Sequence, residues 1–357
     1  MTPSKQELER SARQAAARIP AGRRTAALAA AGTAAATAAG AAGVAGLRRL
    51  ISSGGGALDS TSYRLLAGEP VSDGIKRVVT ARVDNALAEL RGETDGDHAE
   101  AVHEARKDMK KIRSVVRLVR DALGEEAYRR ENDHYRDIGR TLSSFRDAEV
   151  MVQTLETLQG RFEPARERFR RLREQLEADL GRGRDDGSLE QAMARAGGAL
   201  EQGRARTESW PLSGDDWKLI EPGLRRSYRR GRKRLRAVEE EPSVVNLHEW
   251  RKRVKDLWYQ LRLIRDAEPA LIGALAEHAH LLSEHLGDDH DLALLREEAG
   301  ARGDAFAEAG DQRLLFELID QRRGELRFAA TALGERIYTE RPKQFTKALA
   351  ARWRAWR

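Results

Sequence analysis

The chain contains two copies of one segment, and this duplication constrains its fold more than any other feature. VHEARKDMKKIRSVVRLVRDA at residues 102–122 aligns without a gap with LHEWRKRVKDLWYQLRLIRDA at residues 247–267, an offset of 145 residues (248 − 103 = 145). Ten of the 21 aligned pairs are identical. A segment that returns at a fixed spacing indicates a fold built from repeated units. The chain should therefore contain the structural unit of this segment twice.

Both copies have the pattern of an amphipathic helix with one basic face. At ~100° per residue, the cations of residues 103–120 fall on one side of the helix and Val102, Ala105, Met109 and Ile112 fall on the other. Because an apolar stripe must be buried against other helices, the basic stripe faces water or an anionic ligand. A solvated charged face would explain one such helix. The same residue types at the same spacing in the second copy favour a ligand, since most surface substitutions change stability by less than ~0.5 kcal/mol.

The composition predicts an all-α protein. Among 357 residues, 34% are charged and 5% aromatic, and only nine are proline. Long runs rich in Ala, Leu, Glu and Arg, with little alternation of apolar and polar residues, are typical of helices. The expected helices cover residues 72–91, 102–122, 125–158, 162–179, 189–208, 220–240, 247–267, 270–299, 311–338 and 342–356.

The duplication extends beyond the repeated helix. GIKR at 74–77 resembles GLRR at 223–226, and RTLSSFRDAEVM at 140–151 aligns with EHLGDDHDLALL at 284–295. We therefore expect two pseudo-symmetric antiparallel helical bundles, residues 63–212 and 213–357, related by a pseudo-twofold axis.

Residues 1–62 differ from the rest of the chain. The Ala/Gly/Thr tract at 25–47 has the length of a membrane span, which needs ~20 residues. Its strongly apolar members are few, which favours a flexible low-complexity tail. We therefore expect no membrane partner.

The charge balance predicts an anionic partner. Lys and Arg total 64 against 57 Asp and Glu, a net charge of +7, which suits nucleic acid, phosphate polymers or membrane surfaces. Residues 224–236 contain eight cations and no acid. Like charges one helical turn apart repel each other, so a polyanion would relieve the repulsion. The absence of cysteine suits a reducing cytoplasm.

These segments resemble the conserved-histidine α-helical domain (CHAD) family of inorganic polyphosphate-binding modules, over about residues 63–357. YRLLAGEPVSDGIKR near the start and YTERPKQF at 338–345 are also similar to that family. The resemblance implies two bundles around a basic channel that holds polyphosphate without hydrolysing it, with no cofactor, in the cytoplasm and in association with polyphosphate granules. The contacts that it implies are His103, Arg106, Lys107, Lys110, Arg113, Arg117, Arg136, Arg140, Arg226, Arg230, His248, Arg251, Lys252, Lys255, Tyr259 and Arg262.

At two positions, the two halves of the chain would not contribute equally to the basic channel. Arg113 aligns with Trp258, and Arg140 aligns with Glu284. The histidine at the head of each stripe adds a donor with an ordinary pKa of ~6.5. If both histidines contact the ligand, binding should tighten below that pH.

Two other functions remain open at this stage. His278 and His285 share a helical face and could bind a divalent metal, and the His290–Asp291 pair is similar to those of metal-dependent phosphohydrolases. Nucleic acid is the other alternative, although the stripes lack interleaved aromatic residues for base stacking. We expect a binding protein, with no enzymatic activity and no resident metal.

Overall fold

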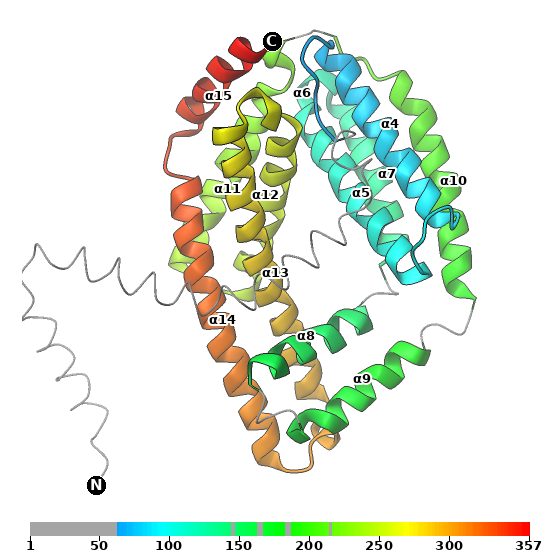
Figure 1. Cartoon of the computed structure of the whole chain (residues 1–357), viewed down its shortest axis with the longest axis vertical. Coiled ribbons are helices and arrows are strands. Elements are labelled where there is room, and N and C mark those ends of the chain that lie inside the picture. Colours follow the sequence, from blue (N-terminus) through cyan, green and yellow to red (C-terminus); the bar gives the residue numbers. More distant parts are fainter. Residues whose placement is uncertain (1–62, 144–146, 163–166, 183–186, 214–215) are drawn as a thin grey trace, which may run out of the picture. The chain divides into compact units, whose positions relative to one another are not determined.

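The computed structural model describes residues 63–143, 147–162, 167–182, 187–213 and 216–357. These residues form helices joined by short connections and contain no β-strand, so the all-α prediction is confirmed (Figure 1). The tail predicted for residues 1–62 lies outside the described residues.

Most of the long helices form two groups with similar packing (Figure 1). In the first group α4 packs against α5 and α10, and α7 packs against the same two helices. In the second group α12 packs against α11 and α13, and α13 packs along α14, while α15 covers α11. The bounds are α4 Val71–Leu90, α5 His98–Leu118, α7 Glu125–Thr141, α10 Ser188–Glu208, α11 Glu221–Glu240, α12 Val244–Leu263, α13 Ala274–Ala301, α14 Ala309–Ile337 and α15 Pro342–Trp356.

The two repeat helices begin and end in the same way. The side chain of Asp97 accepts the N–H of Glu100 at 2.8 Å at the start of α5, and Ser243 caps α12. Such caps satisfy N–H groups that lack an intrahelical partner. α5 ends at Leu118 and α12 at Leu263, again 145 residues apart (263 − 118 = 145). The predicted helices 102–122 and 247–267 therefore begin and end too late, because the Arg-Asp-Ala ends of both repeats form separate short helical segments, α6 (Arg120–Leu123) and Arg265–Ala267.

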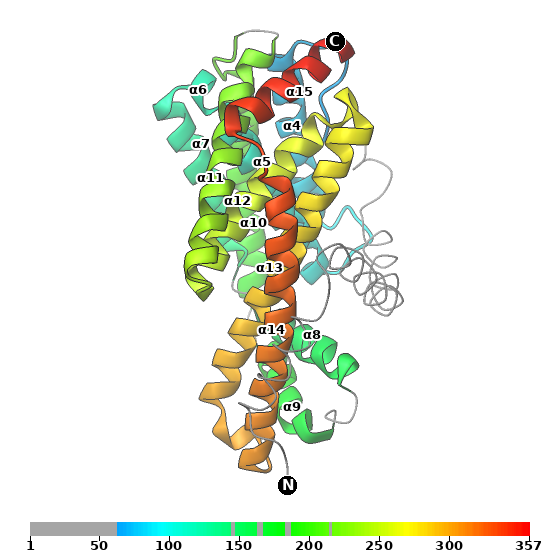
Figure 2. The same ribbon diagram turned by 90° about the vertical axis from the view of Figure 1, so that its left-hand side faces the viewer.

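The helix predicted over residues 125–158 is also wrong, because it is two helices. α7 ends at Thr141 and α8 spans Asp147–Arg161. The aligned part of the second half lies within α13, which is continuous. The difference has a packing cause: α8 packs against α9 (Arg170–Arg182) and α13 rather than continuing beside α5. In both views α8 and α9 lie beside the ends of α13 and α14 (Figures 1 and 2).

The hydrophobic core consists of two clusters at different positions along the helices. Each cluster contains residues from both halves of the sequence. The larger core joins α5 residues such as Met109 and Ile112 to Trp250 and Leu257 of α12. The second core joins α8 and α9 to the remote parts of α13 and α14, through Leu155, Phe169, Leu172, Leu292 and Leu315. Both cores thus contain residues from either side of the predicted boundary at residues 212/213, and the division into two bundles stays a prediction.

A close approach fixes α11 against the end of α5. A Cβ added to Gly223 would lie 1.9 Å from the carbonyl oxygen of Leu118. That oxygen belongs to the backbone, so the neighbour cannot rotate away, and only glycine fits without moving a helix. Gly198, in α10, has no heavy atom within 4 Å of such a Cβ.

Gly223→Ala should therefore lower the free energy of unfolding by about 2 kcal/mol or more, because overpacking a filled contact forces the backbone to shift. Gly198→Ala should raise it by about 0.5–1 kcal/mol, since alanine loses less conformational entropy in a helix. Urea unfolding of both variants measures the difference. Equal effects would contradict the close approach.

Candidate anion-binding cavity

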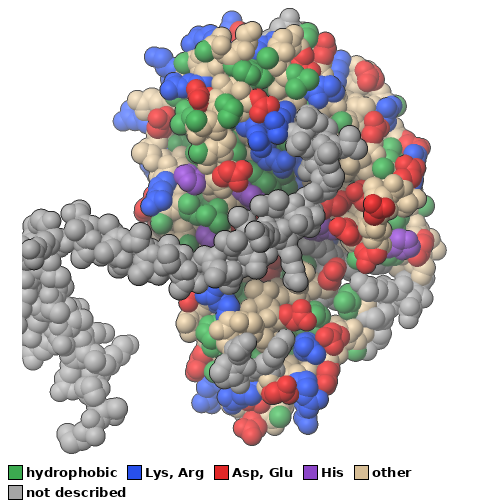
Figure 3. All heavy atoms as spheres, in the orientation of Figure 1, with side chains coloured by type: hydrophobic (Ala, Val, Ile, Leu, Met, Phe, Trp, Pro, Cys, Tyr) green, Lys and Arg blue, Asp and Glu red, His purple; other side chains and the backbone are tan. Residues whose placement is uncertain are grey.

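A cavity of about 570 Å³ lies among α5, α7 and α12. Ten of its lining residues are Lys or Arg, and two are acidic, Glu249 and Asp256. Over the face drawn in Figure 3, by contrast, acidic and basic side chains are intermingled. The cationic lining residues are Arg106, Lys110, Arg113, Arg117, Arg136, Arg140, Arg251, Lys252, Arg253 and Lys255.

Helical periodicity puts the α5 cations on one wall. Arg106, Lys110, Arg113 and Arg117 recur every three or four residues, so they share a face, and all four line the cavity. The opposite face of α5 is buried, with Ala105 at 0% exposure. Burial of the apolar side therefore directs these four cations toward the cavity.

Asp256 links the two repeat helices at the cavity. Its carboxylate accepts a hydrogen bond from Nη1 of Arg117 in α5 at 2.8 Å, and it forms an ion pair with Nη1 of Arg253 at 3.1 Å. Beside it, Ser114 Oγ donates to the carbonyl oxygen of Asp256 at 3.0 Å. Asp256 is buried, so its charge is compensated by these two arginines rather than by water.

Two other arginines of the cavity each have a nitrogen atom without such a hydrogen bond. The Nε atoms of Arg113 and Arg251 are buried, and neither has a hydrogen-bond partner among the described residues. Burial lowers the pKa of Arg113 to about 10, and the neighbouring charges of Arg117 and Arg136 contribute to this shift. Arg251 packs beside Gly287, where an added Cβ would lie 3.0 Å from its Nη2. A bound anion would supply both guanidinium groups with acceptors.

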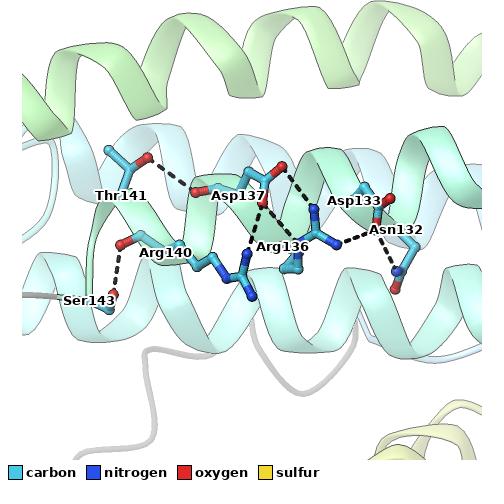
Figure 4. A network of polar contacts seen from close by, with 7 residues as sticks. All are labelled: Asn132, Asp133, Arg136, Asp137, Arg140, Thr141 and Ser143. Carbon is cyan, nitrogen blue, oxygen red and sulfur yellow. Dashed lines mark hydrogen bonds and ion pairs between the residues drawn. The ribbon is translucent and has the colours of Figure 1, made fainter.

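The α7 wall carries a network of carboxylates and arginines (Figure 4). Arg136 Nη1 pairs with Asp133 at 2.7 Å, and its Nε pairs with Asp137 at 2.9 Å. Arg140 approaches Asp137 at 3.8 Å. The two α7 cations are thus already paired, although Arg140 remains 72% exposed.

Eleven of the sixteen residues implied by the sequence line this cavity. Arg226 and Arg230 instead line a second cavity of about 510 Å³ between α6 and α11, where Arg226 pairs with Asp121. The structure does not bring the other three into either cavity: the residues that line them do not include His103, Lys107 and Arg262.

Different edges of the two basic stripes line the cavity. This difference explains why His103, Lys107 and Arg262 lie outside it. His248 and Lys252 line it, but their counterparts His103 and Lys107 lie near Glu104, with Lys107 Nζ 2.6 Å from its carboxylate. Conversely Arg117 lines it, but its counterpart Arg262 lies over the rings of Tyr63 and Trp258. The two helices thus present different parts of their basic stripes to the cavity.

The counterparts of two cavity arginines are aromatic side chains that stack on each other. Trp258, the counterpart of Arg113, stacks on His280 with ring centroids 4.2 Å apart and an interplanar angle of 2°. At the offset of 144 that aligns residues 140–151 with 284–295, His280 is the counterpart of Arg136. The departure seen at Trp258 in the sequence therefore marks a face with a different surface chemistry.

Sequence reasoning missed several lining residues. Arg253, Glu249, Tyr135 and Ser143 also line the cavity. Arg253 aligns with Asp108 in the first copy, so the comparison of the repeats gave no reason to select it. Its spacing of three from Asp256 was the available signal, since residues three apart are neighbours on a helix.

His248 packs against His290 of α13, with ring centroids 4.4 Å apart. Burial first, and the charges of His290, Lys252 and Arg251 next, lower the pKa of His248 to about 4. The pKa of His290 is also lowered, by burial first and by Arg251 next. The ordinary value of ~6.5 expected from the sequence therefore does not apply to His248 in the empty cavity.

The described residues contain no group of three or more His, Cys, Asp or Glu side chains that could hold a metal ion. His278 and His285 thus do not form the metal site considered from the sequence. None of the described helices is both long and apolar enough to span a bilayer.

A model of the CHAD domain family matches residues 77–300, more than half of the chain. The chain belongs to the CHAD family. A crystal structure of the CHAD domain from the plant Ricinus communis is similar to it, with 16% sequence identity and a TM-score of 0.44, over 84% of this chain and 96% of that one. No curated protein matches the chain.

Anion binding to this CHAD protein should be coupled to proton uptake at His248. The ring is neutral above its pKa of about 4, and a bound phosphate chain raises that pKa by favouring the protonated form. Affinity should therefore rise as the pH falls through the pKa of the complex and level off below that of the free protein. In binding isotherms with long-chain polyphosphate, we expect this rise to continue as the pH is lowered toward about 4, the pKa of His248 in the free protein.

His248→Gln should flatten the pH profile. His278→Gln, at an exposed position, should keep the profile of the natural protein. A pH dependence that His248→Gln leaves unchanged would exclude this histidine as the proton acceptor.

Proposed function

We propose that the protein binds inorganic polyphosphate in the cavity among α5, α7 and α12. The observation that carries this proposal is the excess of ten cations over two carboxylates in one cavity. Rows of cations along helices, with a rise of ~1.5 Å per residue, offer a series of donors that suits a linear polyanion better than a single phosphate. Arginine can bind each phosphate group with two parallel hydrogen bonds.

We further propose that binding is not followed by hydrolysis. Both acidic lining residues are engaged by cations: Asp256 by Arg117 and Arg253, and Glu249 by Lys252 at 2.6 Å. The hydrogen bond from Lys252 lowers the pKa of Glu249, which makes this carboxylate a weaker general base. The protein would then hold the polymer intact and associate with polyphosphate granules.

Nucleic acid fits the cavity less well. The tyrosines of its lining, Tyr135 and Tyr259, are 0% and 3% exposed, so neither ring is free to stack on a base. Binding of single strands without sequence preference depends on exposed aromatic platforms. Duplex DNA at equal phosphate concentration should therefore fail to displace long-chain polyphosphate, and displacement in a competition assay would favour the nucleic-acid alternative.

Arg113→Ala combined with Arg251→Ala should weaken polyphosphate binding by about tenfold or more, because hydrogen bonds to charged groups are worth about 1.5–3 kcal/mol each. The matched control is Arg91→Ala with Arg204→Ala. It removes the same charge from half-exposed pairs with Glu201 and Asp84. Titration calorimetry at two salt concentrations measures both variants, and affinity should fall steeply with salt in each. Equal losses would show that net charge, and not the cavity, determines affinity.

A further inference from the structure

Asp137 lies at the α7 rim of the cavity among three of its arginines. Its carboxylate binds Arg136 through both oxygens, at 2.9 Å to Nε and 3.2 Å to Nη2. It also approaches Arg140 at 3.8 Å. The pKa of Asp137 is lowered first by the hydrogen bond from Arg136, and the charges of Arg140 and Arg113 contribute. One carboxylate thus interacts with three cations that line the candidate ligand site.

A phosphate chain in the cavity must compete with this carboxylate. The two oxygens of Asp137 occupy the Nε and Nη2 atoms of Arg136, which form an edge of the guanidinium suited to bidentate phosphate binding. Asp133 occupies Nη1 of the same group. Full engagement of Arg136 by a ligand therefore requires that these intramolecular bonds break. The side chain of Asp137 is 58% exposed, so it can move aside into water.

The fold does not need a carboxylate at this position. At the offset of 144 residues, Asp137 aligns with Leu281, Arg136 with His280 and Arg140 with Glu284 (281 − 137 = 144). α13 forms a helix there with Leu281 in place of Asp137, and the counterparts of the two arginines, His280 and Glu284, lie 3.7 Å apart as a pair of their own. A substitution that removes only the charge of Asp137 should therefore leave α7 folded.

We propose that Asp137 is an intramolecular competitor that limits the affinity of the cavity for polyphosphate by occupying Arg136 and Arg140. This inference rests on the proposed function. It assigns to Asp137 a role opposite to that of Asp256, whose buried carboxylate joins α5 to α12. On the α7 wall of the cavity, displacement of this carboxylate would then free the cations for the ligand.

The test is Asp137→Asn, which keeps the shape of the side chain and removes its charge. Affinity for long-chain polyphosphate should rise by about threefold or more, a size typical of a good exposed ion pair. The plot of log affinity against log salt should also steepen, by up to about 0.7 for each arginine that then exchanges counterions for phosphate. Asp133→Asn frees one donor atom of Arg136 and should give a smaller gain.

Asp84→Asn is the matched control. Asp84 pairs with Arg204 at 2.6 Å with similar exposure, 49%, and neither residue lines the cavity. This variant gains the same charge and should bind within about twofold of the natural protein, with an unchanged salt slope. Thermal unfolding of all three variants confirms that each is folded.

The outcomes separate the two proposals. If the natural protein shows no saturable binding of long-chain polyphosphate, the proposed function itself fails. If it binds but Asp137→Asn matches Asp84→Asn in affinity and salt slope, only the competitor role fails. Weaker binding by Asp137→Asn would also overturn that role, because it would mean that the carboxylate orients the arginines for the ligand.

Discussion

The packing of α5 against α12 is the contact on which the candidate site depends. Both helices bury their apolar sides in one core, which leaves their basic stripes no place except the surface that they share. At the junction, Gln260 Nε2 donates to the carbonyl oxygen of Ser114 at 3.2 Å, and Asp256 holds Arg117 across the interface. Directional hydrogen bonds between buried groups fix the relative position of two helices more narrowly than apolar contacts do. This junction keeps the two rows of cations on either side of one cavity.

Repulsion among the cations of the cavity opposes this packing of α5 against α12. Ten cations around about 570 Å³ repel each other, and the lowered pKa of Arg113 shows that burial and its neighbours disfavour its charged form. The surrounding core must supply the stability that this repulsion removes. The proposed polyanion would reverse the balance, because it would provide acceptors for the Nε atoms of Arg113 and Arg251 and neutralise several cations at once. Binding of the ligand and removal of the repulsion among the cations would thus have the same electrostatic origin.

The two copies of the repeat have diverged in the surfaces that they form. On the cavity face Arg113 and Arg136 contribute guanidinium groups, whereas their counterparts Trp258 and His280 stack face to face. Stacked rings bury apolar area and need no counter-ion. The duplication therefore preserves the helices and their core contacts while one face retains the basic cavity. The break between α7 and α8, absent from α13, is a second divergence, and it moves α8 into the smaller core.

The sequence by itself determined the helices, their repetition and the residue types on each face. The 3.6-residue period of α5 and α12 selected Arg106, Lys110, Arg113 and Arg251 correctly as cavity residues, because periodicity encodes which side of a helix is polar. It did not reveal which edge of that side faces the cavity. His103 and Lys107 were therefore misplaced, and Arg253 was missed. That choice depends on the rotation of each helix about its own axis when it packs, and this rotation is set by contacts with residues distant in sequence, such as Ser114 with Asp256 and Gln260. Only the tertiary structure decided it.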